Sequence, residues 1–451
     1  MNIIIIGGGS VGAALCAQLV KEGHDITVVD RDIAAVTEIS NLSDVAGVVG
    51  NGADVSVLRK AGAARADLAI AVTTDDEVNI LTCAAAKKLG AKHTIARVRN
   101  PEYSELIGLM KSELNLSMTL NPEYAAAKEI FRILRYPSAA KLDTFCRGRV
   151  ELAQFVVPED SPLSGHTLNE IRPKMNRHFL VCCVMRDNAA VIPDGNFELR
   201  CGDVICVTVA EDDITPFFKE AGVYKEPVKD VLIFGGGRIT YYLEQFLQRS
   251  KIGSTVIEKD KELCRDLAEQ YSCTVVCDNG TNQDLLLEEG IDRTDAFIAL
   301  SPVDEENAIV SMYAKTVGVK KIVTLISRMQ YIDFFKSVGL ESIVSPKSSM
   351  AALTLRYVRA LANTRDAEIE SLHRIMEDKV EALEFVIKDD VDGLTGIPLK
   401  DLKTKHGLLI ACILHKEKVV IPSGGDTIEK GDTVIVVTVD DKIDNIKDIL
   451  R

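Results

Sequence analysis

The amino-acid sequence predicts an α/β protein with two doubly wound parallel-sheet domains, each followed by a small α+β domain. Short apolar runs alternate with helical patterns over roughly the first 140 residues. This pattern returns at a constant offset of 228 residues, which maps Gly7 onto Gly235 and Asp30 onto Glu258. A β-rich segment follows each alternating segment, and the two β-rich segments also resemble each other. The order along the chain is therefore A–B–A′–B′.

The first alternating segment contains five apolar runs that we expect to be strands. The run at residues 3–7 is continuous, as in a strand that is buried on both faces. The other strands are expected at 25–30, 45–52, 67–73 and 93–98. Helical spacing predicts helices at 10–23, 54–62 and 77–90, the first ending at Gly23. Strands that alternate with helices in this way are typical of a parallel sheet with helices on both faces.

The β-rich segment predicts a different, smaller domain. Strands are expected at 150–157, 179–186 and 203–210, around one short helix at 167–174. Amphipathic helical patterns at 125–137 and 350–363 are predicted to cross from the larger to the smaller domain, and an apolar crossover helix also suits an interface. The predicted boundaries are 1–124 (first parallel-sheet domain), 125–143 (crossover helix), 144–225 (first small domain), 228–348 (second parallel-sheet domain), 349–366 (crossover helix) and 367–451 (second small domain).

The composition excludes several classes of protein. A net charge of −14 and the absence of Trp argue against a nucleic-acid partner. No apolar run approaches the ~20 residues of a membrane-spanning helix, and the N-terminus lacks the features of a signal peptide. Eleven scattered cysteines without a CxxC motif favour reduced, buried thiols in a cytoplasmic protein. Cys273 and Cys277 can share a strand face, but no second ligand pair lies close, so a metal site is disfavoured.

The segment Gly7–Gly12 fits the pattern GxGxxG between a predicted strand and a predicted helix. Its first glycine permits a tight turn, Gly9 lets the backbone approach phosphates, and Gly12 lets helix and strand pack closely. A pyrophosphate would lie at the helix N-terminus, where N–H groups are free. Asp30 ends the next strand, where it can accept hydrogen bonds from adenosine ribose hydroxyls and disfavours the 2′-phosphate of NADP. The alternative interpretation is a tight turn without a ligand.

Three further side chains of the first segment extend this site. Thr73 and Thr74 end the fourth strand at the edge where such folds bind ligands, and they also suit the cap of the next helix. Arg97 is a candidate phosphate-binding cation. In the second segment Thr240 replaces the third glycine and Leu325 replaces Arg97, while Arg238 offers a different cation. Nucleotide binding by the second segment is therefore left open.

An enzyme that transfers hydride to a dinucleotide also needs a substrate domain with a general acid or base. The first small domain offers His166 and His178, without a paired constellation around either. A duplicated glycine turn without such chemistry favours a nucleotide sensor. An NAD-dependent oxidoreductase remains the alternative.

The motifs GGGSVG, VVDRD, NGAD, VTTDDEVN and ARVRNPEY, with the later IPDG and GD, resemble the RCK (KTN) domains that regulate potassium transport. The resemblance covers essentially the whole chain. It implies two Rossmann-like RCK-N lobes, each followed by an RCK-C lobe, and no catalysis. It also implies binding of NAD(H) and of ATP or ADP. The expected assembly is a homo-oligomer, a dimer or a tetramer ring, on the cytoplasmic face of the inner membrane beneath a potassium pore subunit of the TrkH/TrkG type.

The resemblance also implies site residues in both lobes. In the first lobe they are Gly7, Gly8, Gly9, Ser10, Val11, Asp30, Asn51, Thr73, Thr74 and Arg97. In the second lobe they are Gly235, Gly236, Gly237, Arg238, Ile239, Glu258, Asn279 and Ser301. Nucleotide exchange is expected to rearrange the ring and change pore opening. Two alternatives stay open, namely regulation of another cation transporter or antiporter and a cyclic-dinucleotide site in the RCK-C lobes.

Overall fold

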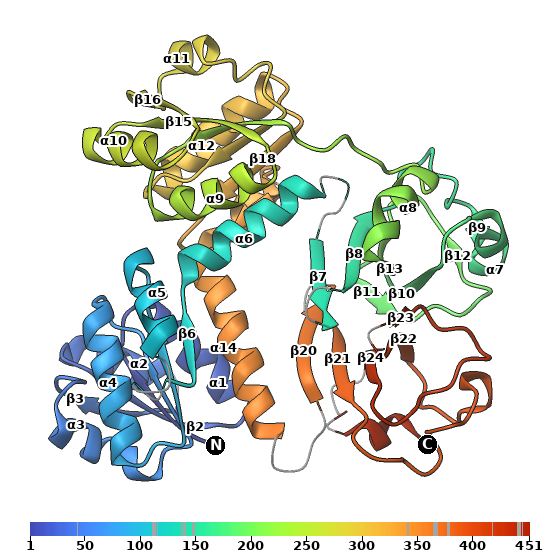
Figure 1. Ribbon diagram of the computed structural model, residues 1–451, viewed down its shortest axis with the longest axis horizontal. Helices are drawn as coiled ribbons and strands as arrows, with labels where there is room; N and C mark the ends of the chain where they lie inside the picture. Colours follow the sequence, from blue (N-terminus) through green and yellow to red (C-terminus); the bar gives the residue numbers. More distant parts are fainter. Residues whose placement is uncertain are drawn as a thin grey trace. The chain divides into compact units, whose positions relative to one another are not determined.

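The computed structural model divides the chain into two compact units (Figure 1). It describes residues 1–451 apart from 43, 111–113, 115, 137, 139–140, 147–148, 341, 364–368, 377–378, 417, 440–442 and 444. One unit comprises residues 1–131 and 229–355, and the other comprises 132–228 and 356–451. The chain therefore passes through each unit twice, as the predicted A–B–A′–B′ order requires.

The domain expected to be the first RCK-N lobe, and given that name below, is a six-stranded parallel sheet with the order β3-β2-β1-β4-β5-β6. Its strands are β1 (Asn2–Ile6), β2 (Asp25–Asp30), β3 (Ala46–Val49), β4 (Leu68–Ala71), β5 (His93–Arg97) and β6 (Met118–Leu120). Its helices are α1 (Ser10–Lys21), α2 (Ile33–Leu42), α3 (Val55–Lys60), α4 (Asp76–Leu89) and α5 (Pro101–Met110). This strand order is that of a dinucleotide-binding sheet, with its switch point between β1 and β4.

The central strand explains why this sheet has helices on both faces. Side chains Ile3 to Ile6 alternate in direction along β1, yet all four are buried. The predicted strand at 45–52 is shorter in the structure, because the chain bends at Gly50, whose N–H still donates to the Asp30 carbonyl of β2 at 2.8 Å. The sequence analysis did not predict helices α2 and α5 or strand β6.

The second RCK-N lobe repeats the first, with the strand order β16-β15-β14-β17-β18-β19. Its strands are β14 (Asp230–Phe234), β15 (Gly253–Glu258), β16 (Thr274–Cys277), β17 (Ala296–Ala299), β18 (Lys321–Leu325) and β19 (Ser342–Val344). Its helices are α9 (Arg238–Arg249), α10 (Lys261–Gln270), α11 (Gln283–Glu288), α12 (Asp304–Thr316) and α13 (Ile332–Ser337). The constant offset in the sequence is thus a repeat of the whole sheet.

The two RCK-C lobes have antiparallel five-stranded sheets, with the orders β11-β10-β13-β8-β7 and β20-β21-β24-β22-β23. The first lobe contains β7 (Lys141–Phe145), β8 (Val150–Val156), β9 (His166–Thr167), β10 (Phe179–Arg186), β11 (Ala189–Val191), β12 (Glu198–Leu199), β13 (Val204–Ala210), α7 (Leu168–Ile171) and α8 (Ile214–Glu220). The second contains β20 (Ile369–Ile375), β21 (Val380–Val386), β22 (Leu408–His415), β23 (Lys418–Val420) and β24 (Thr433–Thr438). A shared core cluster contains residues of both lobes, including Phe145, Cys182 and Cys412.

The crossover helices α6 (Pro122–Arg135) and α14 (Pro346–Asn363) each begin in one unit and end in the other. The predicted crossover segment 125–143 runs past α6 into β7, and its residues 137, 139 and 140 lie outside the described residues. Residues 364–366 of the second predicted crossover segment also lie outside them. The domain boundaries stay predictions.

Within the first unit, α6 packs on α9 of the second RCK-N lobe. The rings of Tyr124 and Phe131 lie 5.5 and 5.4 Å from the ring of Phe246. Asn121 Nδ2 donates to the Tyr242 hydroxyl at 2.8 Å, and that hydroxyl donates to the Arg99 carbonyl at 3.0 Å. α6 therefore forms an interface between the two repeats of one chain, and its predicted role in a dimer stays a prediction.

None of the described helices combines the length and the apolar character needed to cross a bilayer. No group of three or more potential metal ligands occurs in the described part of the chain.

Candidate nucleotide-binding site

The glycine loop between β1 and α1 needs glycine at two positions. Gly7 has a φ of +111°, and a Cβ there would lie 2.9 Å from the Val72 carbonyl oxygen. A Cβ on Gly12 would lie 1.8 Å from the Gly7 carbonyl oxygen, so helix and strand can approach only without a side chain. A Cβ on Gly9, by contrast, would meet no atom within 4 Å. The backbone at Gly9 thus faces open space at the start of α1.

The N-terminus of α1 has the properties of an anion site. Gly9 is its N-cap and supplies no side chain to accept hydrogen bonds from the first turn. No acidic residue occupies that turn. Backbone N–H groups that start at Ser10 and Val11 therefore point at the place where Rossmann-like folds bind a pyrophosphate.

Asp30 is held against the glycine loop. Its Oδ2 accepts a hydrogen bond from the Gly8 backbone N–H at 2.5 Å, and its Oδ1 accepts one from the Asp32 N–H at 2.9 Å. Each oxygen keeps a second lone pair, with which it can accept a ribose hydroxyl. The acid and the phosphate loop are therefore connected before a ligand arrives.

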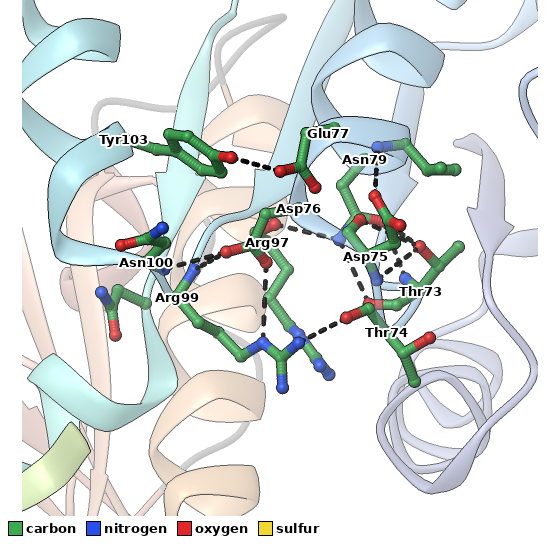
Figure 2. Close-up of polar contacts among 12 residues, drawn as sticks. Thr73, Thr74, Asp75, Asp76, Glu77, Asn79, Arg97, Arg99, Asn100 and Tyr103 are labelled. Atoms are coloured by element: carbon green, nitrogen blue, oxygen red, sulfur yellow. Dashed lines mark hydrogen bonds and ion pairs between the residues drawn. The ribbon is translucent and has the colours of Figure 1, made fainter. Parts of the chain in front are cut away.

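A buried asparagine joins the ends of β4 and β5 (Figure 2). Asn79 Oδ1 accepts hydrogen bonds from the Thr73 backbone N–H at 2.8 Å and from its hydroxyl at 2.7 Å. Asn79 Nδ2 donates to the carbonyl oxygens of Thr73 and Arg97 at 3.2 and 3.0 Å. Thr73 N in turn lies against Gly7, where a Cβ would approach to 2.9 Å. The glycine loop, Thr73 and Arg97 are thus linked through Asn79 at the C-terminal edge of the sheet, and we call this part of the candidate site its edge.

Asp76 and Arg99 complete this edge (Figure 2). Asp76 Oδ2 accepts hydrogen bonds from the backbone N–H groups of Arg99 and Asn100 at 2.8 and 2.9 Å. The guanidinium of Arg99 lies 3.6 Å from Asp76 Oδ1 and donates to the Thr74 carbonyl oxygen. Asp76 therefore fixes the chain just after β5, where both arginines are presented.

Arg97 carries the clearest sign of an anionic ligand. The residue is 9% exposed, and its Nε is buried without a hydrogen-bond partner among the described residues. Burial lowers the pKa of Arg97 from its ordinary value, and the positive charge of Arg99 lowers it further. Arg238, in the second lobe's glycine turn, adds a smaller effect in the same direction. Because Arg99 and Arg238 disfavour the charged form of Arg97, the charge of a phosphate beside Arg97 would be favourable.

Glu123, at the start of α6, is a second acid beside this arginine cluster, after Asp76. Burial raises the pKa of Glu123, and the charges of Arg99, Arg97 and Arg238 oppose that rise. Its Oε2 is buried and has no hydrogen-bond partner among the described residues. Glu123 therefore offsets part of the cluster's positive charge without forming a closed ion pair with it.

The second lobe keeps most of the same framework. Glu258 Oε2 accepts a hydrogen bond from the Gly236 N–H at 2.6 Å, and Oε1 accepts one from the Asp260 N–H at 2.9 Å. Asn307 Oδ1 accepts from the Ser301 N–H at 2.8 Å, and its Nδ2 donates to the Ser301 and Leu325 carbonyls. Thr240 differs from Gly12, because its hydroxyl donates to the Gly235 carbonyl at 2.5 Å.

The structure does not join every predicted site residue to this edge. Asn51 Oδ1 accepts a hydrogen bond from Arg31 at 2.9 Å, and Asn279 Oδ1 accepts one from the Thr281 hydroxyl at 3.0 Å. The predicted caps Thr73 and Thr74 do not cap α4, because Asp75 is its N-cap and accepts a hydrogen bond from the Val78 N–H at 2.9 Å. The remaining predicted residues, Gly237, Arg238 and Ile239, lie in the second glycine turn and the first turn of α9.

The predicted site residues did not include Asp76, Asn79 and Arg99, although the sequence offered a reason to consider each of them. Asn79 and Asp76 recur as Asn307 and Asp304 at the repeat offset. Arg99 follows Arg97 by two residues.

Comparison with known proteins identifies the family. The TrkA-N domain model matches residues 3–114 and 231–346, and the TrkA-C domain model matches residues 152–222 and 383–451. A Trk system potassium uptake protein TrkA homolog of Archaeoglobus fulgidus is 32% identical over 453 residues, covering 100% of both chains. The Trk system potassium uptake protein TrkA of Vibrio alginolyticus is 31% identical over 452 residues, covering 98% of this chain and 96% of its own.

Solved structures support the same fold. A GsuK channel bound to NAD matches 97% of this chain and 76% of its own, with a TM-score of 0.64 and 18% identity. A GsuK structure bound to ADP matches 80% of this chain and 69% of its own, with a TM-score of 0.52 and 16% identity. With both domain types present twice and relatives aligned along the full length, the chain belongs to the TrkA family, the non-enzymatic regulatory RCK proteins of Trk potassium uptake.

Proposed function

We propose that this chain binds NAD(H) and ATP or ADP in its RCK-N lobes and uses them as signals to gate a membrane potassium pore. The observation that carries the proposal is the glycine loop whose Gly8 N–H is bonded to Asp30, together with the buried Arg97, whose Nε has no hydrogen-bond partner among the residues that the structure describes. The GsuK structures with NAD and with ADP support the choice of ligands. A pore subunit of the TrkH/TrkG type on the cytoplasmic side of the membrane is the proposed partner.

The ligands share an adenosine and differ beyond their first two phosphates. The glycine loop and Asp30 hold what they share, and Arg97 with Arg99 meets the part in which they differ. A ligand can shift a protein between two shapes only if its affinity for the two shapes differs. The arginine edge therefore gives ATP and NADH different effects on the same ring. Ring rearrangement, as a dimer or tetramer of chains, then changes pore opening.

Binding in the second lobe is part of the proposal. Glu258, Asn279 and Ser301 occupy the equivalent positions, and Glu258 is bonded to Gly236 as Asp30 is to Gly8. Arg238 supplies a cation beside the loop in place of the missing counterpart of Arg97.

A thermal-shift screen with NADH, NAD, ATP, ADP and NADPH tests this function. The wild-type chain is compared with Asp30→Ala and with Glu258→Ala, which are matched changes in the two lobes. The first variant is expected to lose at least about tenfold in affinity at the first lobe, since a hydrogen bond to a charged group contributes about 1.5–3 kcal/mol. NADPH is expected to give the smallest shift. If no adenine compound stabilises the wild-type chain, the proposed function is wrong.

A further inference from the structure

Two cysteines of the second RCK-N lobe border the acid of its nucleotide motif. Cys264 lies on α10, and its thiol donates a hydrogen bond to the Glu258 backbone carbonyl at 3.2 Å. Cys277 ends β16, the edge strand of the sheet, where it is paired in register with Glu258. Glu258, which anchors the glycine loop, therefore has one cysteine bonded to its carbonyl and another paired with it on the neighbouring strand, where α10, β15 and β16 lie together (Figure 1).

Both cysteines therefore adjoin the same residue, Glu258. Burial raises the pKa of Cys264 to about 12, and the neighbouring Cys277 side chain contributes to the rise. Cys264 is buried, whereas Cys277 is exposed, and both are free cysteines. Cys277 is consequently the thiol that a small oxidant reaches first, and Cys264 is a protonated partner held against it.

The first RCK-N lobe provides an internal comparison. Its residues at the same offset are Val36, which is buried, and Val49, which is exposed. Val49 is paired in register with Asp30, as Cys277 is with Glu258. The thiol pair thus belongs to the second lobe alone. Because the first lobe accommodates valine at both positions, valine is a structurally matched replacement for each cysteine.

We infer that Cys264 and Cys277 are a redox modification site that closes to a disulfide in the presence of a peroxide. Cys277 sulfur attacks one peroxide oxygen, the O–O bond breaks, and a sulfenic acid and water form. Cys264 sulfur then attacks the Cys277 sulfur and the S–O bond breaks. The Cys264 proton leaves with the departing hydroxide as a second water, so two thiols and one peroxide give one disulfide and two waters.

Closure changes the neighbourhood of the nucleotide loop. It removes the S–H donor from the Glu258 carbonyl and draws α10 and β16 together. The space there is small, because a Cβ on Gly236 would lie 3.0 Å from Glu258 Cβ and 2.9 Å from Leu267 Cδ1 of α10. A shift of α10 or of Glu258 would therefore disturb the hydrogen bond that the Gly236 N–H donates to the Glu258 carboxylate. An effect on nucleotide affinity rests on the proposed function, whereas the disulfide itself does not.

The first test maps the disulfide in the full-length chain. Reduced protein is treated with hydrogen peroxide, free thiols are alkylated, and peptides are analysed by mass spectrometry. We expect a crosslink between the Cys264 and Cys277 peptides that a dithiol reductant reverses. Cys264→Val and Cys277→Val should each lack it, while Cys201→Ser, a change at another exposed cysteine, should keep it. Absence of the crosslink in the wild type, or bonding of Cys277 to a different cysteine, overturns the inference.

The second test measures the effect on the loop without a nucleotide. Amide hydrogen exchange of residues 235–239 is compared in reduced and oxidised chains, with the Cys264→Val/Cys277→Val chain as control. We expect exchange to be several-fold faster in the oxidised wild type only. Equal exchange rates in the two redox states would overturn the inferred effect of the disulfide on the glycine loop.

Nucleotide titrations separate the two proposals. They are made in an Asp30→Ala background, so that the second lobe is observed. Oxidation is expected to weaken binding by about fivefold or more, the lower end of typical coupling between sites. A disulfide and faster loop exchange without nucleotide binding in either state would refute binding by the second lobe and leave the redox site intact.

Discussion

Arg97 illustrates how a single side chain can report on a ligand. A buried guanidinium with an unsatisfied Nε costs stability unless an anion pairs with it. The sequence identified Arg97 correctly as a cation at the end of a strand, but it could not show the burial or the neighbouring Arg99 and Arg238. Those properties arise from side chains that come together only in the folded unit.

The first prediction concerns this residue. Arg97→Ala should weaken ATP binding by about tenfold more than NADH binding, because charge-assisted hydrogen bonds to the third phosphate are lost. Calorimetric titration of both ligands measures the difference. Arg59→Ala, a change at an exposed arginine of α3, should alter neither affinity. Equal losses for ATP and NADH would contradict the assignment of Arg97 to the distal phosphate.

Glu244 gives a prediction for stability. It lies on α9, is 2% exposed, and accepts a hydrogen bond from the Ser254 hydroxyl at 2.8 Å. Burial raises its pKa from 4.5 to about 7, and Tyr271 and Cys273 lie near enough to sense its charge. The equivalent residue of the first lobe is Cys16, which is also buried.

The sign of the pH dependence follows from the raised pKa. The folded chain holds the Glu244 proton more tightly than the unfolded chain, so its contribution to stability is full below about pH 4.5 and is lost as the pH rises through about 7. The loss amounts to about 3 kcal/mol. Glu244→Gln should flatten this slope in denaturant unfolding between about pH 5 and 8, and Glu269→Gln, at an exposed position, should not. An unchanged slope in Glu244→Gln would show that another group causes it.

At the scale of elements, Asn79 determines how the ends of β4 and β5 are joined. It is fully buried and bonds the Thr73 N–H, the Thr73 carbonyl and the Arg97 carbonyl. Asn79→Ala leaves these groups unsatisfied and should destabilise the chain by about 2–4 kcal/mol. Asn307→Ala is the matched change in the second lobe.

The two variants separate structure from binding. Both should lower the unfolding free energy, but only Asn79→Ala should weaken nucleotide binding in the first lobe. Denaturant unfolding of each variant measures the change in unfolding free energy. Nucleotide titration of each variant, made in a Glu258→Ala background, measures the change in affinity of the first lobe. Similar affinity losses in both variants would mean that the strand junction acts on the whole unit.

The elements predicted from sequence are those with strong local signals. The buried run of β1, the glycine turn and the body of helix α4 were all recognisable, because each depends on neighbours in the chain. The cap of α4 was not, since Asp75 caps it in place of Thr73 or Thr74. Helix α2 was not, since Ile33 and Leu42 are 67% and 78% exposed and blur its apolar face. The predicted helix 167–174 is α helical only over Leu168–Ile171, because Thr167 and Glu170 form a capping box and Pro173 follows.

At the scale of the molecule, duplication is the feature from which function follows. Each chain carries two nucleotide motifs, and α6 links the first RCK-N lobe to α9 of the second through Tyr124, Phe131 and Phe246. The repeat was visible in the sequence as a constant offset, but the pairing of the lobes was not, because it depends on contacts between residues more than 100 positions apart. We therefore expect a change at one proposed nucleotide site to affect the other through this packed interface.

Potassium flux through a reconstituted pore tests the central claim most directly. Vesicles that contain a TrkH-type pore subunit receive the wild-type chain or Asp30→Ala, with ATP or with NADH, and the nucleotide is recovered and analysed afterwards. The account predicts that flux with the wild-type chain differs between the two nucleotides, that Asp30→Ala removes the difference, and that both nucleotides are recovered intact. Equal flux with both nucleotides, or consumption of either one, would contradict it.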